Sequence, residues 1–190
     1  MNGTTVTGQS YNLTDPWATP ICGDDIRIHL GGIRRFNGTG LTVLAHSLLV
    51  ARIYQGPNPA LAACHDFCEA FVGDLSPVQY EQAPLLKHCE ELWLKRIAAG
   101  LGVLLNDREG VDHADRLAAA VEACHLGLPA WERMNPLIRG AAQLLLSQPW
   151  LPPYIDYLER APAHELWGDL VGRYFPRHRV GFCLPRKGDA

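Results

Sequence analysis

The chain has 190 residues, a length that fits one domain with a sizeable apolar core. Apolar residues make up 47% of it and charged residues 19%, which excludes a disordered or fibrous protein. The formal net charge of −3 argues against a protein that coats nucleic acid, because such proteins carry an excess of Lys and Arg.

Residues 1–25 are rich in Gly, Thr, Asn, Asp and Pro, and we expect an irregular N-terminal arm with a short hairpin around Thr7–Asn12. The apolar spacing beyond the arm has a helical period. It predicts helices over residues 26–33, 41–55, 59–72, 84–101, 108–126, 133–147, 152–160 and 163–174. Pro77 and Pro84 are expected to bracket a loop. Because period-2 alternation is nearly absent, the predicted fold class is all-α, a single helical domain over residues 26–175 with a loose basic tail over 176–190.

The polar N-terminus, MNGTTVTGQSYNLTDPW, has neither the basic start nor the apolar stretch of a signal peptide. No apolar run approaches the ~20 residues that span a bilayer. We therefore expect a cytoplasmic protein with no membrane segment and no stable nucleic-acid binding. The six Cys residues form no CxxC pair, so buried free thiols are expected rather than a disulfide framework.

Three predicted helices place metal-binding side chains among apolar neighbours. His46 lies in LTVLAHSLLVARI, His65 and Asp66 lie in ALAACHDFCEAFVGD, and Asp115 lies in GVDHADRLAAAVEA. A lone His on an apolar face is more often a hydrogen-bonded core residue than a ligand. An ionised Asp in an Ala-rich helix, however, is costly unless it is paired or bound to a metal. Two His and two Asp would form a site that suits Mn, Fe, Co, Ni or Zn better than Ca.

Two further carboxylates follow the His-Asp pair. Glu69 comes four residues after His65 and three after Asp66, so a helix would place all three on one face. Asp74 follows directly after Gly73. A carboxylate beside a metal-activated water can orient the water or accept its proton. Glu69 alone would be read as half of a surface ion pair, but beside His65 and Asp66 we interpret it as catalytic.

The pattern His46 … His65-Asp66 … Asp115 resembles the H…HD…D signature of the HD-domain metal-dependent phosphohydrolases. It is most similar to the branch of bacterial deoxyribonucleoside 5′-nucleotidases and phage HD phosphohydrolases, which includes phage dATP triphosphohydrolases. The similarity covers about residues 7–125, in the segments TGQSYNLTDP, RRFNG, LTVLAHSLLVA, CHDFCEAFVGDLSPVQY and DHADRL. Its most specific part is the HDxxExxxGD block with the upstream His.

This resemblance implies a helical domain that binds one divalent metal ion, whether Mn, Co, Zn, Fe, Ni or Mg. The implied metal ligands are His46, His65, Asp66 and Asp115. The implied reaction is the hydrolysis of phosphate from a (deoxy)nucleotide by a metal-activated water, either as a dNTP triphosphohydrolase or as a 5′-nucleotidase.

The resemblance also implies roles for residues around the metal. Glu69 would assist the water, Asp74 would lie near the ester oxygen, and Arg35 would contact the phosphate. From the residues themselves, Trp17 and Ile21 in DPWATPI are candidates to pack over the base at the entrance, or else to plug the helical bundle. Further candidates for binding the phosphate are Lys87, His113 and Arg116. Relatives are commonly homo-oligomers, and the apolar stretch WLPPYIDYLERAPAHELW is consistent with a partner surface.

Two positions depart from the pattern of the relatives. Gln79 and Asp112 stand where relatives often carry Lys residues that serve the substrate phosphates. These departures motivate an alternative, a catalytically degenerate HD scaffold that binds a nucleotide or a protein partner. The complete set of His and acidic residues argues against that alternative, because a scaffold has little physical reason to keep buried ionisable groups.

Overall fold

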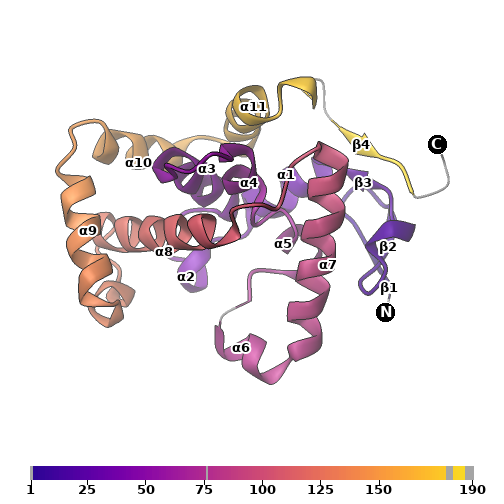
Figure 1. Cartoon of the computed structure of the whole chain (residues 1–190), viewed down its shortest axis with the longest axis horizontal. Coiled ribbons are helices and arrows are strands. Elements are labelled where there is room, and N and C mark those ends of the chain that lie inside the picture. The colour runs from indigo at the N-terminus through magenta and orange to yellow at the C-terminus, as the bar shows by residue number, and fades with distance from the viewer. Residues whose placement is uncertain (1, 76, 179–181, 187–190) are drawn as a thin grey trace.

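The computed structural model describes residues 2–75, 77–178 and 182–186 and confirms the all-α fold (Figure 1). The helices of the described chain are α1 (Gly23–Gly32), α2 (Arg35–Gly38), α3 (Val43–Ile53), α4 (Pro59–Cys64), α5 (Glu69–Val72), α6 (Pro77–Gln82), α7 (Pro84–Leu101), α8 (Arg108–His125), α9 (Pro136–Leu146), α10 (Leu151–Arg160) and α11 (Ala163–Tyr174). The short strands are β1 (Asn2–Thr4), β2 (Ser10–Asn12), β3 (Ile21–Cys22) and β4 (Cys183–Leu184). Single 3₁₀ turns cover Pro16–Ala18, Pro129–Arg133 and Pro176–His178.

The α3 helix is the centre of the domain. It packs against α1, α4, α8, α10 and α11, and its residues from Val43 to Ala51 are all buried. Such a helix is apolar around its whole circumference. His46 and Ser47 are its buried polar side chains. A buried His at the centre of the domain must find partners on the surrounding helices, and this requirement locates the site described below.

The predicted loop between Pro77 and Pro84 is wrong. Residues 77–82 form α6, and Pro84 begins α7. A proline is compatible with the first turn of a helix, where its missing N–H has no intrahelical acceptor. The two prolines therefore mark the starts of two successive helices.

The N-terminal arm is more ordered than the sequence predicts. A hairpin is present but begins earlier than expected, with Asn2 opposite Asn12 and Thr4 opposite Ser10, so its turn covers residues 5–9. The Thr7 N–H and hydroxyl donate to the two carboxylate oxygens of Asp25, at 2.7 and 2.9 Å, and tie this turn to α1. Helix α1 also begins at Gly23, before the expected end of the arm.

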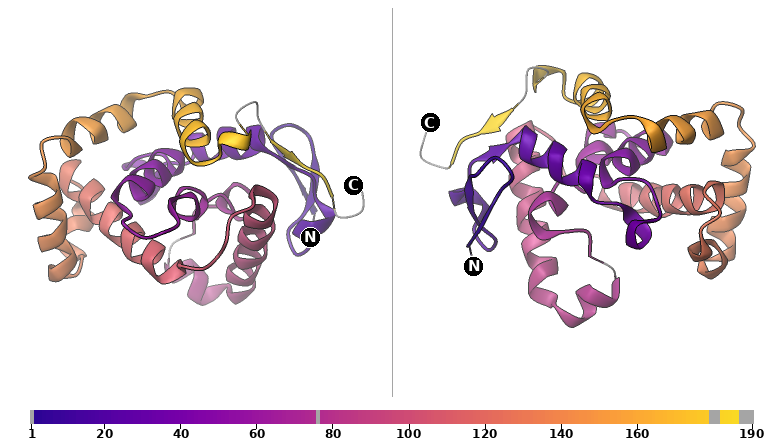
Figure 2. Two further views of the ribbon diagram at one scale, coloured as in Figure 1. Left: turned by 45° about the horizontal axis from the view of Figure 1, so that its top comes forward. Right: turned by 180° about the vertical axis from the view of Figure 1, so that it is seen from behind.

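The expectation of a loose tail is wrong for its described parts, residues 176–178 and 182–186. Strand β4 pairs antiparallel with β3, and Phe182 and Leu184 are buried. The Arg96 guanidinium of α7 donates to the Pro185 carbonyl oxygen at 2.6 Å. All four strands lie at one end of the molecule, far from α9 at the other (Figures 1 and 2).

The cysteines agree in part with expectation. All six Cys are free, and Cys64, Cys68 and Cys89 are buried, whereas Cys183 is exposed. Among the described residues, no helix combines the length and the apolar character needed to cross a membrane.

Candidate metal centre

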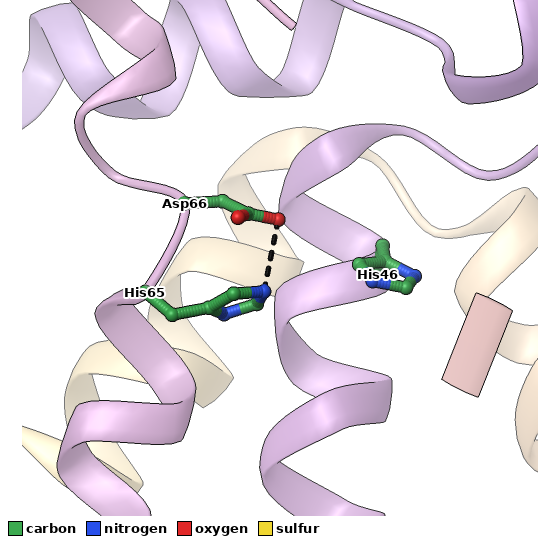
Figure 3. A group of neighbouring side chains, drawn as sticks. All are labelled: His46, His65 and Asp66. Carbon is green, nitrogen blue, oxygen red and sulfur yellow. Dashed lines mark ion pairs between the residues drawn. The ribbon is translucent and has the colours of Figure 1, made fainter. Parts of the chain in front are cut away.

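Three parts of the fold bring the predicted ligands together. His46 comes from α3, His65 and Asp66 come from the turn between α4 and α5, and Asp115 comes from α8. One ligand atom from each of His46, His65 and Asp66 lies within 4.8 Å of the others (Figure 3). The Asp115 Oδ1 atom lies 2.8 Å from His46 Nε2 and 3.9 Å from His65 Nε2. His46, His65 and Asp66 therefore form one cluster, and Asp115 lies beside the two His rings of that cluster.

The predicted helix over residues 59–72 is interrupted at the His-Asp pair. Helix α4 ends at Cys64 and α5 begins at Glu69. Between them the Phe67 N–H donates to the Cys64 carbonyl at 3.1 Å, the three-residue spacing of a 3₁₀ turn. Neighbouring residues of a regular α-helix point about 100° apart. In the tighter turn, by contrast, the neighbouring side chains of His65 and Asp66 both face the site (Figure 3).

The hydrogen bonds of both His rings leave the Nε2 atoms directed at the cluster. The His65 Nδ1–H donates to the Ala62 carbonyl oxygen at 2.8 Å, and a carbonyl can only accept. The His46 Nδ1–H donates to Glu122 Oε2 at 3.1 Å. Metal-binding His residues commonly use one nitrogen for such an outer partner and the other for the metal.

The polar atoms around this point fit a cation. His65 Nε2 and Asp66 Oδ2 are buried and make no hydrogen bond, although they form an ion pair at 3.0 Å. A buried atom without a partner is costly, and one divalent ion would satisfy both atoms. The cluster of His46, His65 and Asp66 could thus hold a metal ion. Asp115 is placed to add a further oxygen ligand.

Arg35 places a positive charge at the rim of this acidic cluster. Its guanidinium nitrogens lie 3.7 Å from Asp66 Oδ2, 3.8 Å from Asp115 Oδ1 and 3.7 Å from Glu122 Oε2. Burial opposes its charged form, but the neighbouring carboxylates prevail and raise the Arg35 pKa. Burial likewise opposes ionisation of Asp66, yet His65 and Arg35 hold the Asp66 pKa below its usual range. The group is therefore a network of charges that stabilise one another.

Glu69 and Asp74, the two carboxylates predicted to be catalytic, line the same pocket as Asp66 and Asp115. Glu69 is only 7% exposed, and its Oε2 atom has no hydrogen-bond partner. Burial, followed by repulsion from Asp66 and Asp74, raises the pKa of Glu69 well above its ordinary value. Burial also raises the pKa of Asp74. Both carboxylates and Arg35 line a pocket of about 500 Å³, whose other lining residues are Phe36, Asn37, Asp66, Leu75, Gln79, Glu90 and Asp115.

Three predicted substrate contacts do not reach this pocket. Ile21 is 1% exposed and pairs with Leu184 in the small β3–β4 sheet, so its side chain belongs to the core. The Trp17 ring lies 5.2 Å from the Arg96 guanidinium and packs against α7. Lys87 is an exposed residue of α7 outside the pocket lining. None of the three residues lines the pocket, and Ile21 and Trp17 pack against other parts of the fold.

Sequence reasoning missed Glu122, which is completely buried in α8. It lies seven residues after Asp115, two helical turns along the same face. The run LAAAVEACH carries the same signal that identified Asp66, an acidic residue among small apolar neighbours. Applied to Glu122, that reasoning would have predicted a buried partner for a His or Arg.

Comparison of the sequence with models of known protein families and with curated proteins gives no match.

Proposed function

We propose that this chain is a divalent-metal-dependent phosphohydrolase that removes phosphate from deoxynucleotides. One observation carries the proposal. Two His residues have their Nδ1–H groups engaged elsewhere, and a His nitrogen and an Asp oxygen lie buried without hydrogen bonds at the point where the rings meet. This arrangement adjoins a pocket that also holds Arg35 and two further carboxylates.

The charge of the pocket supports a cation as part of the site. Among its described side chains, Asp66, Glu69, Asp74, Glu90 and Asp115 carry carboxylates, and Arg35 alone is basic. A phosphate would be repelled by such a lining unless a cation were bound. A divalent ion held by His46, His65, Asp66 and Asp115 would supply a Lewis acid that activates water and balances charge on the phosphoryl oxygens.

The residues of the chain itself would then divide the remaining tasks. The Arg35 guanidinium, which faces the pocket, would bind two phosphate oxygens. Glu69 Oε2, which has no other partner, would accept the proton of the attacking water. Asp74 would lie beside the ester oxygen that leaves. Phe36 and Leu75 offer apolar surface for the base or sugar, the part first expected of Trp17 and Ile21.

The balance of charges favours a substrate with one phosphate. Each additional phosphate brings negative charge, and Arg35 is the one cationic side chain among the described residues that line the pocket. Gln79 lies in this lining, where relatives of the resembled family often carry Lys. We therefore infer a deoxynucleoside 5′-monophosphate as the substrate class, with a dNTP as the competing substrate.

Product analysis tests this proposal. The metal-stripped protein is incubated with each dNMP and dNTP, with and without added Mn²⁺, Co²⁺, Zn²⁺ or Mg²⁺. Asp66→Ala is run in parallel, and Asp156→Ala serves as the control, because Asp156 belongs to another His–Asp pair, with His125 at 2.8 Å. We expect metal-dependent orthophosphate from dNMPs in wild type and Asp156→Ala only. Triphosphate released from a dNTP would instead identify a triphosphohydrolase. Nucleotide binding without any product would identify the degenerate scaffold.

A further inference from the structure

Glu122 is a buried carboxylate with two engaged oxygens. Its side chain is 0% exposed. Glu122 Oε1 accepts the Leu41 N–H at 2.6 Å, and Oε2 accepts the His46 Nδ1–H at 3.1 Å. The Arg35 Nε atom lies 3.7 Å from Oε2, on the side of the pocket. One side chain of α8 thus connects the entry to α3, a predicted metal ligand and the predicted phosphate-binding Arg.

The chemistry of these partners requires a carboxylate. A backbone N–H can only donate, and the His46 ring presents its Nδ1–H when Nε2 is kept free for a cation. Both partners are therefore donors, and two acceptor oxygens are needed. A Gln in the same place would have one oxygen and one amide group, so its NH₂ would face one of the two donors.

Gly40, the residue before Leu41, leaves space for the Glu122 carboxylate. A methyl group on Gly40 would overlap the Glu122 Oε1 atom and would also press on the Phe36 ring. The absence of a side chain at residue 40 therefore lets the Glu122 carboxylate reach the Leu41 N–H. Gly40 and Glu122, far apart in the sequence, form one structural unit.

We propose that Glu122 is a positioning residue that holds His46 with its proton on Nδ1 and its Nε2 lone pair directed at the bound cation. The proposal rests on the metal site of the proposed function. Loss of this outer partner weakens metal binding by about 10- to 100-fold at comparable sites. Without Glu122, the cation would have to displace a proton from His46 Nε2 or bind a ring that is free to turn.

The test measures Zn²⁺ affinity by competition with a chromogenic chelator, together with ¹H–¹⁵N spectra that show which imidazole nitrogen carries a proton. Glu122→Gln removes the second acceptor, and Gly40→Ala displaces the carboxylate without changing any charge. The matched controls are Glu132→Gln, in a surface pair with Arg139, and Gly32→Ala, where an added methyl group meets no atom within 4 Å. The His65 signals serve as an internal control, because that ring donates to Ala62 and not to Glu122.

We expect Zn²⁺-loaded wild type to carry the His46 proton on Nδ1. Glu122→Gln and Gly40→Ala should bind Zn²⁺ about 10- to 100-fold more weakly and shift the His46 signals, with the His65 signals kept. Equal affinity and unchanged His46 signals in both variants would overturn the role of Glu122 while leaving the metal site intact. Absence of Zn²⁺ binding by wild type would overturn the metal site itself, and this proposal with it. If Glu122→Gln does not fold, the Zn²⁺ affinity and the His46 signals of Gly40→Ala test the role of Glu122.

Discussion

A divalent metal should stabilise the folded protein, and the stabilisation should depend on Asp66. A ligand that binds only the folded state at 100 times its dissociation constant stabilises it by about 2.7 kcal/mol. A domain of this size gains about 2–4 °C in melting temperature per kcal/mol. Adding Zn²⁺ or Mn²⁺ to the metal-stripped wild type should therefore raise the melting temperature by about 5–11 °C.

Asp66→Asn removes one anionic ligand but keeps the shape of the side chain. In wild type, the Asp66 carboxylate repels Glu69 and raises the pKa of Glu69, and it attracts His65 and Arg35. The metal-free variant therefore loses both the repulsion and the attraction. We expect the metal-free variant to melt within a few degrees of wild type, because these effects oppose each other. The metal-induced rise, in contrast, should fall to less than about 2 °C.

Differential scanning calorimetry of both proteins, with and without metal, provides the measurement. Asp156→Asn is the control, because the His125–Asp156 pair is partly exposed and contributes at most about 1 kcal/mol. This variant should keep the full metal-induced rise. An equal rise in Asp66→Asn, or no rise in wild type, would refute the assignment of the cluster as a metal centre.

Glu69→Gln should lower kcat by about 10²- to 10⁴-fold in steady-state kinetics. Its Zn²⁺ affinity, measured by chelator competition, should change little. An unchanged kcat would contradict the role of Glu69 as a base. Because burial, Asp66 and Asp74 raise the pKa of Glu69 in the folded, metal-free protein, the free energy of unfolding should fall as the pH rises through that raised pKa. Urea titrations across pH should show this fall in wild type and not in Glu69→Gln. Arg35→Lys should reduce kcat/KM by about 10- to 100-fold, because an ammonium cannot bind two phosphate oxygens in one plane, and an unchanged value would remove Arg35 from the phosphate site. Burial raises the pKa of the Cys64 thiol to about 12, so native protein should leave Cys64 unmodified by Ellman's reagent at about pH 8, whereas exposed Cys183 should react.

The helical fold was predictable because it depends on local signals, and local signals also identified the ionisable residues that form the cluster. Apolar spacing in the central helix is read directly from the sequence, whereas the proline at the start of α6 was wrongly interpreted as part of a loop. His46, His65, Asp66 and Asp115 were found because each is an ionisable group in an apolar setting. Three of these residues lie together in the folded chain, and Asp115 lies beside His46.

The features that sequence reasoning missed depend on contacts between distant segments. Strand β3 pairs with strand β4, with Cys22 opposite Cys183, and this pairing buries Ile21. It requires the N-terminal arm to meet the C-terminal tail, and no local sequence pattern predicts that contact. The break of the predicted helix at His65 leaves no proline or glycine as a marker. Glu122, like Asp66, is an acidic residue among small apolar neighbours. Its partner His46 is identified only once α3 packs against α8.

Hydrolysis of a dNMP in ¹⁸O-labelled water by metal-loaded protein tests the proposed phosphohydrolase activity. We expect metal-dependent release of orthophosphate that carries one labelled oxygen, an unlabelled nucleoside, and loss of the reaction in Asp66→Asn. No release by wild type with any metal or nucleotide, or equal release by Asp66→Asn, would contradict the claim that this cluster hydrolyses phosphate esters.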